Sequence, residues 1–207
     1  MAVNRRLIHV PIIHTQADMG ALGEAFKRAV INQLGERKWQ LKVDLVERAW
    51  TAIEQALAEL NLRYELVRIY QDGLPVCGHE LRIVTELARA GSRNHRLLLR
   101  MHQRGATIMG TESAELLVEE YQLAKQLLAN SKTLQPRNGA EQNLARTLLK
   151  RRDEFIAARI NDTLKPGETG IVFLGLLHSL RGKLAPDIEL ISLFGDQAIA
   201  PPKDSSR

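Results

Sequence analysis

Short apolar runs alternate with longer segments of helical period, and this alternation most constrains the fold of the chain. The runs predict strands over residues 7–15, 64–70, 106–109, 170–174 and 188–193. Between them, apolar residues recur at intervals of three and four, which predicts helices over 19–62 (broken near residue 35), 79–104, 113–129 and 141–164. Such an order is typical of an α/β protein with a mostly parallel sheet, helices on both faces and more helix than strand. Pro11 inside the first run indicates an edge strand or a bulge there.

Length and composition set limits on the kind of protein. The 207 residues fit one α/β domain, expected over residues 1–199, with a disordered tail over 200–207. Cys77 is the only cysteine, so neither an intrachain disulfide nor a cysteine-rich zinc site can form. No apolar run approaches the roughly 18 residues of a membrane span, and no signal-peptide core is visible. We therefore expect a soluble, cytoplasmic protein without a membrane partner.

The net charge of +5 raises the question of nucleic-acid binding. However, 29 basic and 24 acidic residues are interspersed, and only 4% of the chain is aromatic, so stacking platforms for single strands are scarce. One segment is an exception, because residues 93–104 place several cations at helical spacing, a geometry that can follow phosphates. A binding module with a basic helix for anions or nucleic acid is therefore an alternative, although the composition as a whole disfavours it.

Polar residues with chemical potential follow the predicted strands. They are His14, Asp18, Asp72, Glu112 and His178. Since the carboxyl ends of parallel strands meet at one edge of a sheet, we expect these side chains to gather there, where open α/β sheets bind ligands. Four of them also have a structural interpretation. Asp72 can be a turn former and Asp18 a helix cap, Glu112 can be a helix-start residue, and His178 can be a group bonded to backbone.

The most distinctive element is the run Ile171-Val-Phe-Leu174 followed by Gly175-Leu-Leu-His178. A strand that ends in a tight glycine turn presents one imidazole at the sheet edge. We therefore expect Gly175 and Asp72 to contribute to substrate binding and His178 to chemistry.

Together with the preceding helix, this element resembles a known family. The segments Arg152-Asp153-Glu-Phe-Ile-Ala-Ala-Arg-Ile160, Pro166-Gly167-Glu168 and Gly175-Leu-Leu-His178 are similar to the C-terminal signature of the TraB, Tiki and ChaN-like superfamily, to which erythromycin esterases are related. The resemblance is good over roughly residues 145–182 and partial over 106–117. It implies a functional glutamate, for which Glu112 is the match, and an N-terminal histidine motif, for which His14 is the candidate without the family's glycine.

The resemblance implies an α/β scaffold whose members include metal-dependent proteases, esterases that use histidine and glutamate, and haem-binding or regulatory proteins. For this chain the catalytic set would be His14, Glu112, Arg152 and His178. A divalent metal, Zn²⁺ or Mn²⁺, would take His14, Asp18, Glu112 and His178 and activate water. Without a metal, the same groups could hydrolyse a small-molecule or peptide substrate by acid–base catalysis, with Arg152 stabilising an oxyanion.

Three expectations remain. Arg152 lies near the apolar stripe of the helix over 141–164, so we expect it to be buried and salt-bridged to a carboxylate, whereas Arg151 should be exposed. The alternative to a hydrolase is a non-catalytic binding or regulatory protein on the same scaffold, which the missing N-terminal glycine favours. A homo-oligomer is compatible with the long helices over 19–62.

Overall fold

The computed structural model describes residues 5–13, 22–131 and 139–195. Within these ranges the strands form one parallel sheet in the order β3-β2-β4-β1-β5. The strands are β1 (Arg5–Ile12), β2 (Val67–Gln71), β3 (Thr107–Met109), β4 (Thr169–Gly175) and β5 (Ile188–Ser192). The helices are α1 (Gly23–Leu34), α2 (Glu36–Glu59), α3 (Glu80–Arg89), α4 (Arg93–Gln103), α5 (Ala114–Ser131) and α6 (Gly139–Thr163). The predicted helix-rich α/β class is thus confirmed, whereas the expected tail over 200–207 lies outside the described residues.

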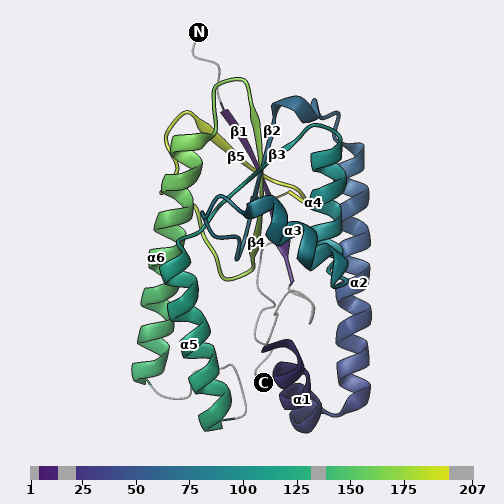
Figure 1. The fold of residues 1–207 in the computed structure, drawn as a ribbon, viewed down its shortest axis with the longest axis vertical. Helices are drawn as coiled ribbons and strands as arrows, with labels where there is room; N and C mark the ends of the chain where they lie inside the picture. The colour runs from purple at the N-terminus through teal and green to yellow at the C-terminus, as the bar shows by residue number, and fades with distance from the viewer. Residues whose placement is uncertain (1–4, 14–21, 132–138, 196–207) are drawn as a thin grey trace.

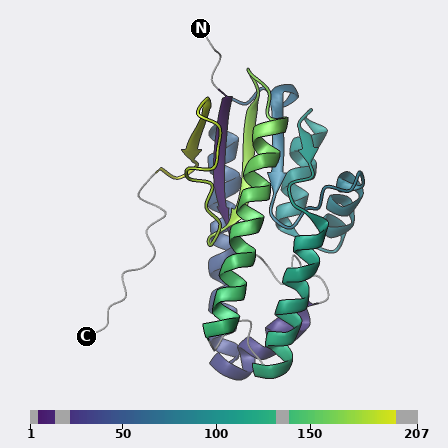
Figure 2. The ribbon, with the colours of Figure 1, turned by 90° about the vertical axis from the view of Figure 1, so that its left-hand side faces the viewer.

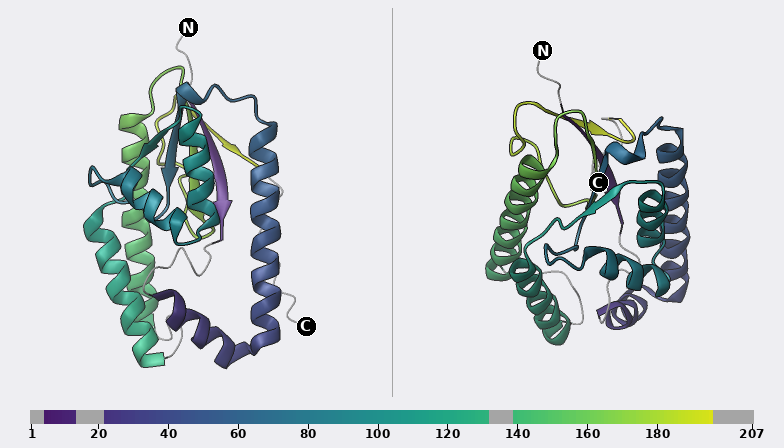
Figure 3. Two further views of the ribbon diagram at one scale, coloured as in Figure 1. Left: turned by 45° about the vertical axis from the view of Figure 1, so that its right-hand side comes forward. Right: turned by 45° about the horizontal axis from the view of Figure 1, so that its top comes forward.

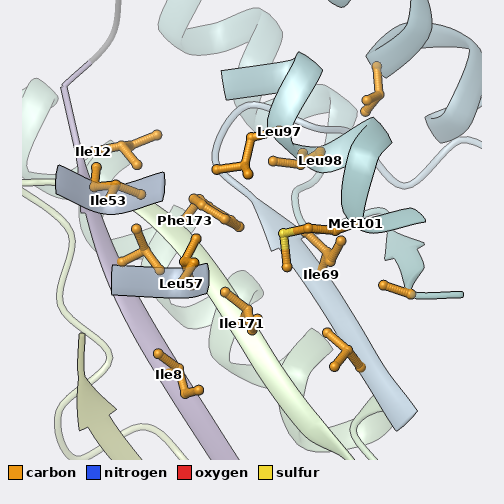
Figure 4. Packing of buried hydrophobic residues seen from close by; sticks show 14 of the residues in the cluster. Ile8, Ile12, Ile53, Leu57, Ile69, Leu97, Leu98, Met101, Ile171 and Phe173 are labelled. Atoms are coloured by element: carbon orange, nitrogen blue, oxygen red, sulfur yellow. The ribbon is translucent and has the colours of Figure 1, made fainter. Parts of the chain in front are cut away.

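Helices cover both faces of the sheet (Figure 1; Figure 3). On one face α2, α3 and α4 pack on β1, β2 and β4 through a cluster of buried aliphatic and aromatic side chains around Trp50, Leu98 and Phe173, part of which is drawn in Figure 4. On the other face α6 packs on the same strands through Ile156 and Ile160. The strands at the centre are therefore buried on both sides, as parallel strands usually are.

Two further helices lie outside these layers. Helix α5 lies alongside α6, as Figure 2 shows. Leu116, Leu123 and Leu127 of α5 form a buried cluster with Leu148 of α6. Helix α1 precedes α2, and the break between them falls at Gly35, as predicted, where φ is +85°. A left-handed backbone angle of this kind favours glycine, so the position at which the helix ends follows from the sequence.

The environment of Pro11 corrects one expectation. Strand β1 is not an edge strand, because β4 pairs with it on one side and β5 on the other. Pairing with β5 ends at His9, however, so the part of β1 that contains Pro11 has a paired strand only on the β4 side. The missing N–H of proline is therefore tolerated within an interior strand.

Candidate functional site

The carboxyl ends of β2, β3 and β4 deliver the polar residues of the site. Asp72 directly follows β2, Glu112 follows β3, and His178 comes three residues after the last residue of β4. Backbone bonds hold these turns together: the amides of Thr111 and Glu112 donate to the Leu74 carbonyl at 2.9 and 3.0 Å. The polar residues after these three strands therefore lie at one edge of the sheet, as the sequence predicts.

Arg152 of α6 occupies the centre of this cluster. Its Nε donates to Glu112 Oε2 at 2.6 Å, and its Nη2 donates to Glu112 Oε1 and to Asp72 Oδ1, each at 2.7 Å. Its Nη1 contacts Glu120 of α5. The side chain of Arg152 is only 4% exposed, whereas that of Arg151 is 50% exposed and pairs with Glu119. Both expectations for these arginines are confirmed.

The charges at Arg152 are strongly coupled. Burial raises the pKa of the Glu112 carboxyl, although the hydrogen bond from Arg152 opposes this shift. Burial alone would lower the pKa of Arg152, but the ion pairs with Glu112 and Asp72 raise it overall. Glu112 also accepts the Gly73 amide at 2.7 Å, so both of its oxygens are engaged. Arg152 therefore remains a cation that locks Glu112 and Asp72 in place.

His178 lies beside this clamp and is oriented by a second carboxylate. Its Nδ1 is 2.6 Å from Asp153 Oδ1, and its Nε2 is 3.5 Å from Asp72 Oδ2. Asp153 also accepts the Ser179 amide at 3.0 Å, and Asp72 accepts the Gly175 amide at 2.9 Å. The turn after β4 is thus tied to α6 and β2, which fixes the position of the imidazole.

Hydrogen bonds set the protonation of this imidazole. Burial would lower the pKa of His178, but the hydrogen bonds to Asp153 and Asp72 outweigh burial and raise the pKa to about 9. At neutral pH His178 is therefore mostly an imidazolium. As the pH approaches 9 it loses the Nε2 proton, while Asp153 continues to hold Nδ1–H.

A cavity of about 650 Å³ opens beside His178. The segment that connects β4 and β5 forms one wall, and His9, Leu174 and Ser192 from the sheet form another. The cavity adjoins the turn that carries His178, whose side chain is only 4% exposed.

The remaining predicted site residues have mixed outcomes. His14 and Asp18 lie outside the described residues. Gly175, predicted to bind substrate, ends β4 and donates its amide to Asp72. The substrate-binding roles of Gly175 and Asp72 stay predictions. The catalytic roles of the other predicted residues also stay predictions.

The expected metal set fits the described part of the site poorly. Arg152 already supplies a positive charge to Glu112 and Asp72. Among residues 5–13, 22–131 and 139–195, no three histidine, cysteine, aspartate or glutamate side chains are arranged to hold a metal. The metal site stays a prediction, since His14 and Asp18 lie outside the described residues.

Sequence reasoning missed Asp153, Glu120 and His9 as site residues. Asp153 stands next to Arg152 in the Arg-Asp pair that carries the family resemblance, so that pair was the available signal. Glu120 had no signal beyond its position on a charged helix, and His9 lies within a strand rather than after one.

The basic helix of residues 93–104 is mostly paired within the protein. Arg93 bonds to Glu47 and Glu54, Arg100 to Glu54, and Arg104 stacks on the Tyr64 ring. These contacts neutralise or shield cations that the spacing had suggested for phosphates. The helix thus contributes more to holding α4 against α2 than to a continuous positive face.

Comparison of the chain with protein-family models, with curated proteins and with solved structures finds no match in any of the three. Within the described ranges, each helix is too short or too polar to cross a membrane.

Proposed function

We propose that the protein is a hydrolase that cleaves an ester- or amide-type bond by acid–base catalysis at His178. The observation that carries the proposal is the imidazole itself, held by Asp153 at 2.6 Å and forming part of the wall of a cavity of about 650 Å³. A carboxylate that binds Nδ1 fixes the tautomer, and proton transfer then takes place at Nε2, whose contact with Asp72 Oδ2 is longer, at 3.5 Å.

In the proposed reaction, neutral His178 accepts a proton at Nε2 from a water molecule that attacks the carbonyl carbon of the substrate. The imidazolium then returns the proton to the leaving group. Asp153 stabilises the imidazolium, and Arg152 holds Asp72 against the turn that carries His178. Arg152 is thus a positioning residue, because its donors are taken by protein carboxylates.

The test is hydrolysis of neutral 4-nitrophenyl esters of increasing acyl length and of fluorogenic peptide amides by wild type and His178→Gln. We expect the substitution to lower kcat/KM at least about a hundredfold, which is the usual contribution of a general base. A matched control is His102→Gln, which removes a half-buried histidine bonded to the Ala106 carbonyl, away from the cavity. Dialysis against EDTA should leave the wild-type rate unchanged.

The pH profile distinguishes a base from a structural histidine. Because the His178 pKa is raised to about 9, kcat/KM should rise with pH with a midpoint near pH 9 and level off above it. Asp153→Asn removes the negative partner and should move the midpoint of that rise to lower pH. A wild-type rate that falls over this range, or a midpoint that Asp153→Asn leaves unmoved, contradicts the proposed role.

A second candidate is a binding protein on the same scaffold that lacks catalysis. The observation in its favour is the complete engagement of Glu112 by Arg152 and the Gly73 amide, which leaves this carboxylate no role toward substrate. If no ester or amide is cleaved faster by wild type than by His178→Gln, this candidate replaces the hydrolase. A cytoplasmic location stays part of both proposals, since the free, exposed thiol of Cys77 suits a reducing compartment.

A further inference from the structure

The end of the cavity formed by the sheet contains two polar side chains from neighbouring strands. His9 of β1 and Ser192 of β5 are direct partners in the parallel register, so both side chains project from the same face of the sheet. Both residues line the cavity, together with apolar residues such as Leu174, Leu180 and Ile188. One small group can therefore reach both polar side chains.

Neither polar side chain is satisfied within the protein. The Nε2 atom of His9 and the Oγ atom of Ser192 are shielded from water, and neither has a hydrogen-bond partner. Buried polar groups without partners destabilise a fold, so such groups in a natural protein call for an explanation. Two such groups at paired positions beside a cavity indicate a ligand that supplies the missing hydrogen-bond partner.

The pair itself is uncharged, whereas the rest of the cavity wall carries positive charge. Burial lowers the pKa of His9, and the nearby His178 lowers it further, so His9 is uncharged at neutral pH. Within the described residues that line the cavity there is no aspartate or glutamate, and the other ionisable groups are His178 and Arg181. A neutral imidazole and a hydroxyl can each donate or accept, which suits a hydroxyl or a carbonyl oxygen.

We propose that His9 and Ser192 recognise an uncharged hydroxyl or carbonyl group of a largely apolar ligand that fills this cavity. Rotation of the two side chains, which border the cavity, turns Nε2 and Oγ toward the ligand. The interpretation as substrate recognition rests on the proposed hydrolase function. In a hydrolase, the pair is a specificity determinant that holds the substrate against His178.

The experiment measures binding rather than turnover, on the full chain, with 2-naphthol and naphthalene as probes. Titrations are followed by NMR of protein with ¹⁵N-labelled histidine, in which the His9 ring signals report contact. We expect 2-naphthol to bind about three- to tenfold more tightly than naphthalene, the gain of one hydrogen bond.

Substitutions assign the effect to the pair. Ser192→Ala and His9→Phe should each reduce the preference for 2-naphthol over naphthalene to less than about twofold. Ser179→Ala is the matched control, since Ser179 lines the same cavity but is exposed. A thermal melt checks that each variant is folded, and if His9→Phe is not, Ser192→Ala alone decides.

The outcomes separate this inference from the proposed function. Equal binding of naphthalene and 2-naphthol, or no binding of either probe at millimolar concentration, overturns the recognition site. His178→Gln should retain 2-naphthol binding. Binding with the expected preference in a protein that hydrolyses nothing supports the site and contradicts only the hydrolase.

Discussion

Removing the guanidinium of Arg152 should destabilise the fold far more than removing that of its neighbour. In Arg152→Met, Glu112 and Asp72 lose their positive partner while their side chains remain buried, at 1% and 5% exposure. Breaking a buried ion pair from one side costs about 3–5 kcal/mol, since a buried charge is left uncompensated. Arg151→Met breaks only the exposed pair with Glu119, for which we expect a loss below about 1 kcal/mol.

The pH dependence of this loss tests its cause. Without Arg152, the pKa of the buried Glu112 carboxyl should rise further above its ordinary value, so acid relieves the penalty by protonating it. Urea unfolding at pH 5 and pH 7.5 should therefore give a smaller loss for Arg152→Met at pH 5. Equal losses for Arg152→Met and Arg151→Met, or a loss that grows at pH 5, would refute the reasoning.

Two further predictions concern stability. The folded-state pKa of His178 lies near 9, above its ordinary value of 6.5, so this group contributes stability that is full below about pH 6.5 and lost as the pH rises to 9. The difference in unfolding free energy between wild type and His178→Gln should shrink by about 3 kcal/mol from pH 6 to pH 9.5, and a constant difference contradicts the raised pKa. Gly110→Ala should cost about 1–3 kcal/mol in urea unfolding, because a Cβ there would lie 2.7 Å from Val76 Cα and 2.9 Å from the Pro75 carbonyl. Gly139→Ala, with open space around it, is the control, and an equal effect of the two would show that close backbone packing at Gly110 does not matter.

The elements that deliver the site were predictable because they depend on local signals. Apolar runs followed by turn residues located the ends of β2, β3 and β4, and in a parallel sheet these ends share one edge. The burial of Arg152 followed in the same way from its place beside the apolar stripe of α6. Such inferences need only periodicity and the rule that parallel strands align.

The parts that depend on side-chain direction and on irregular segments were not predictable. Asp153 follows Arg152 on the same buried side of α6, and only the path of the turn after β4 shows that it meets His178. Likewise, alternation places His9 on the opposite face from Ile8 and Val10, yet no pattern indicates that the segment between β4 and β5 leaves a cavity over it. A segment without repeating structure has no period from which to infer its path.

The site has more negative than positive charge, and this imbalance connects the two parts of the proposed mechanism. Asp72, Glu112 and Asp153 are all buried, while Arg152 supplies one full positive charge and Lys183 only a contact at 3.7 Å with Asp153. The carboxylates therefore stabilise a second positive charge on the His178 imidazole, and this is why the pKa of His178 rises despite burial. Substrate in the cavity would further displace water and strengthen the pull of Asp153 on the imidazolium. The protonated form that follows attack by water is thus the form the surrounding carboxylates stabilise best, which favours proton acceptance at His178 during catalysis.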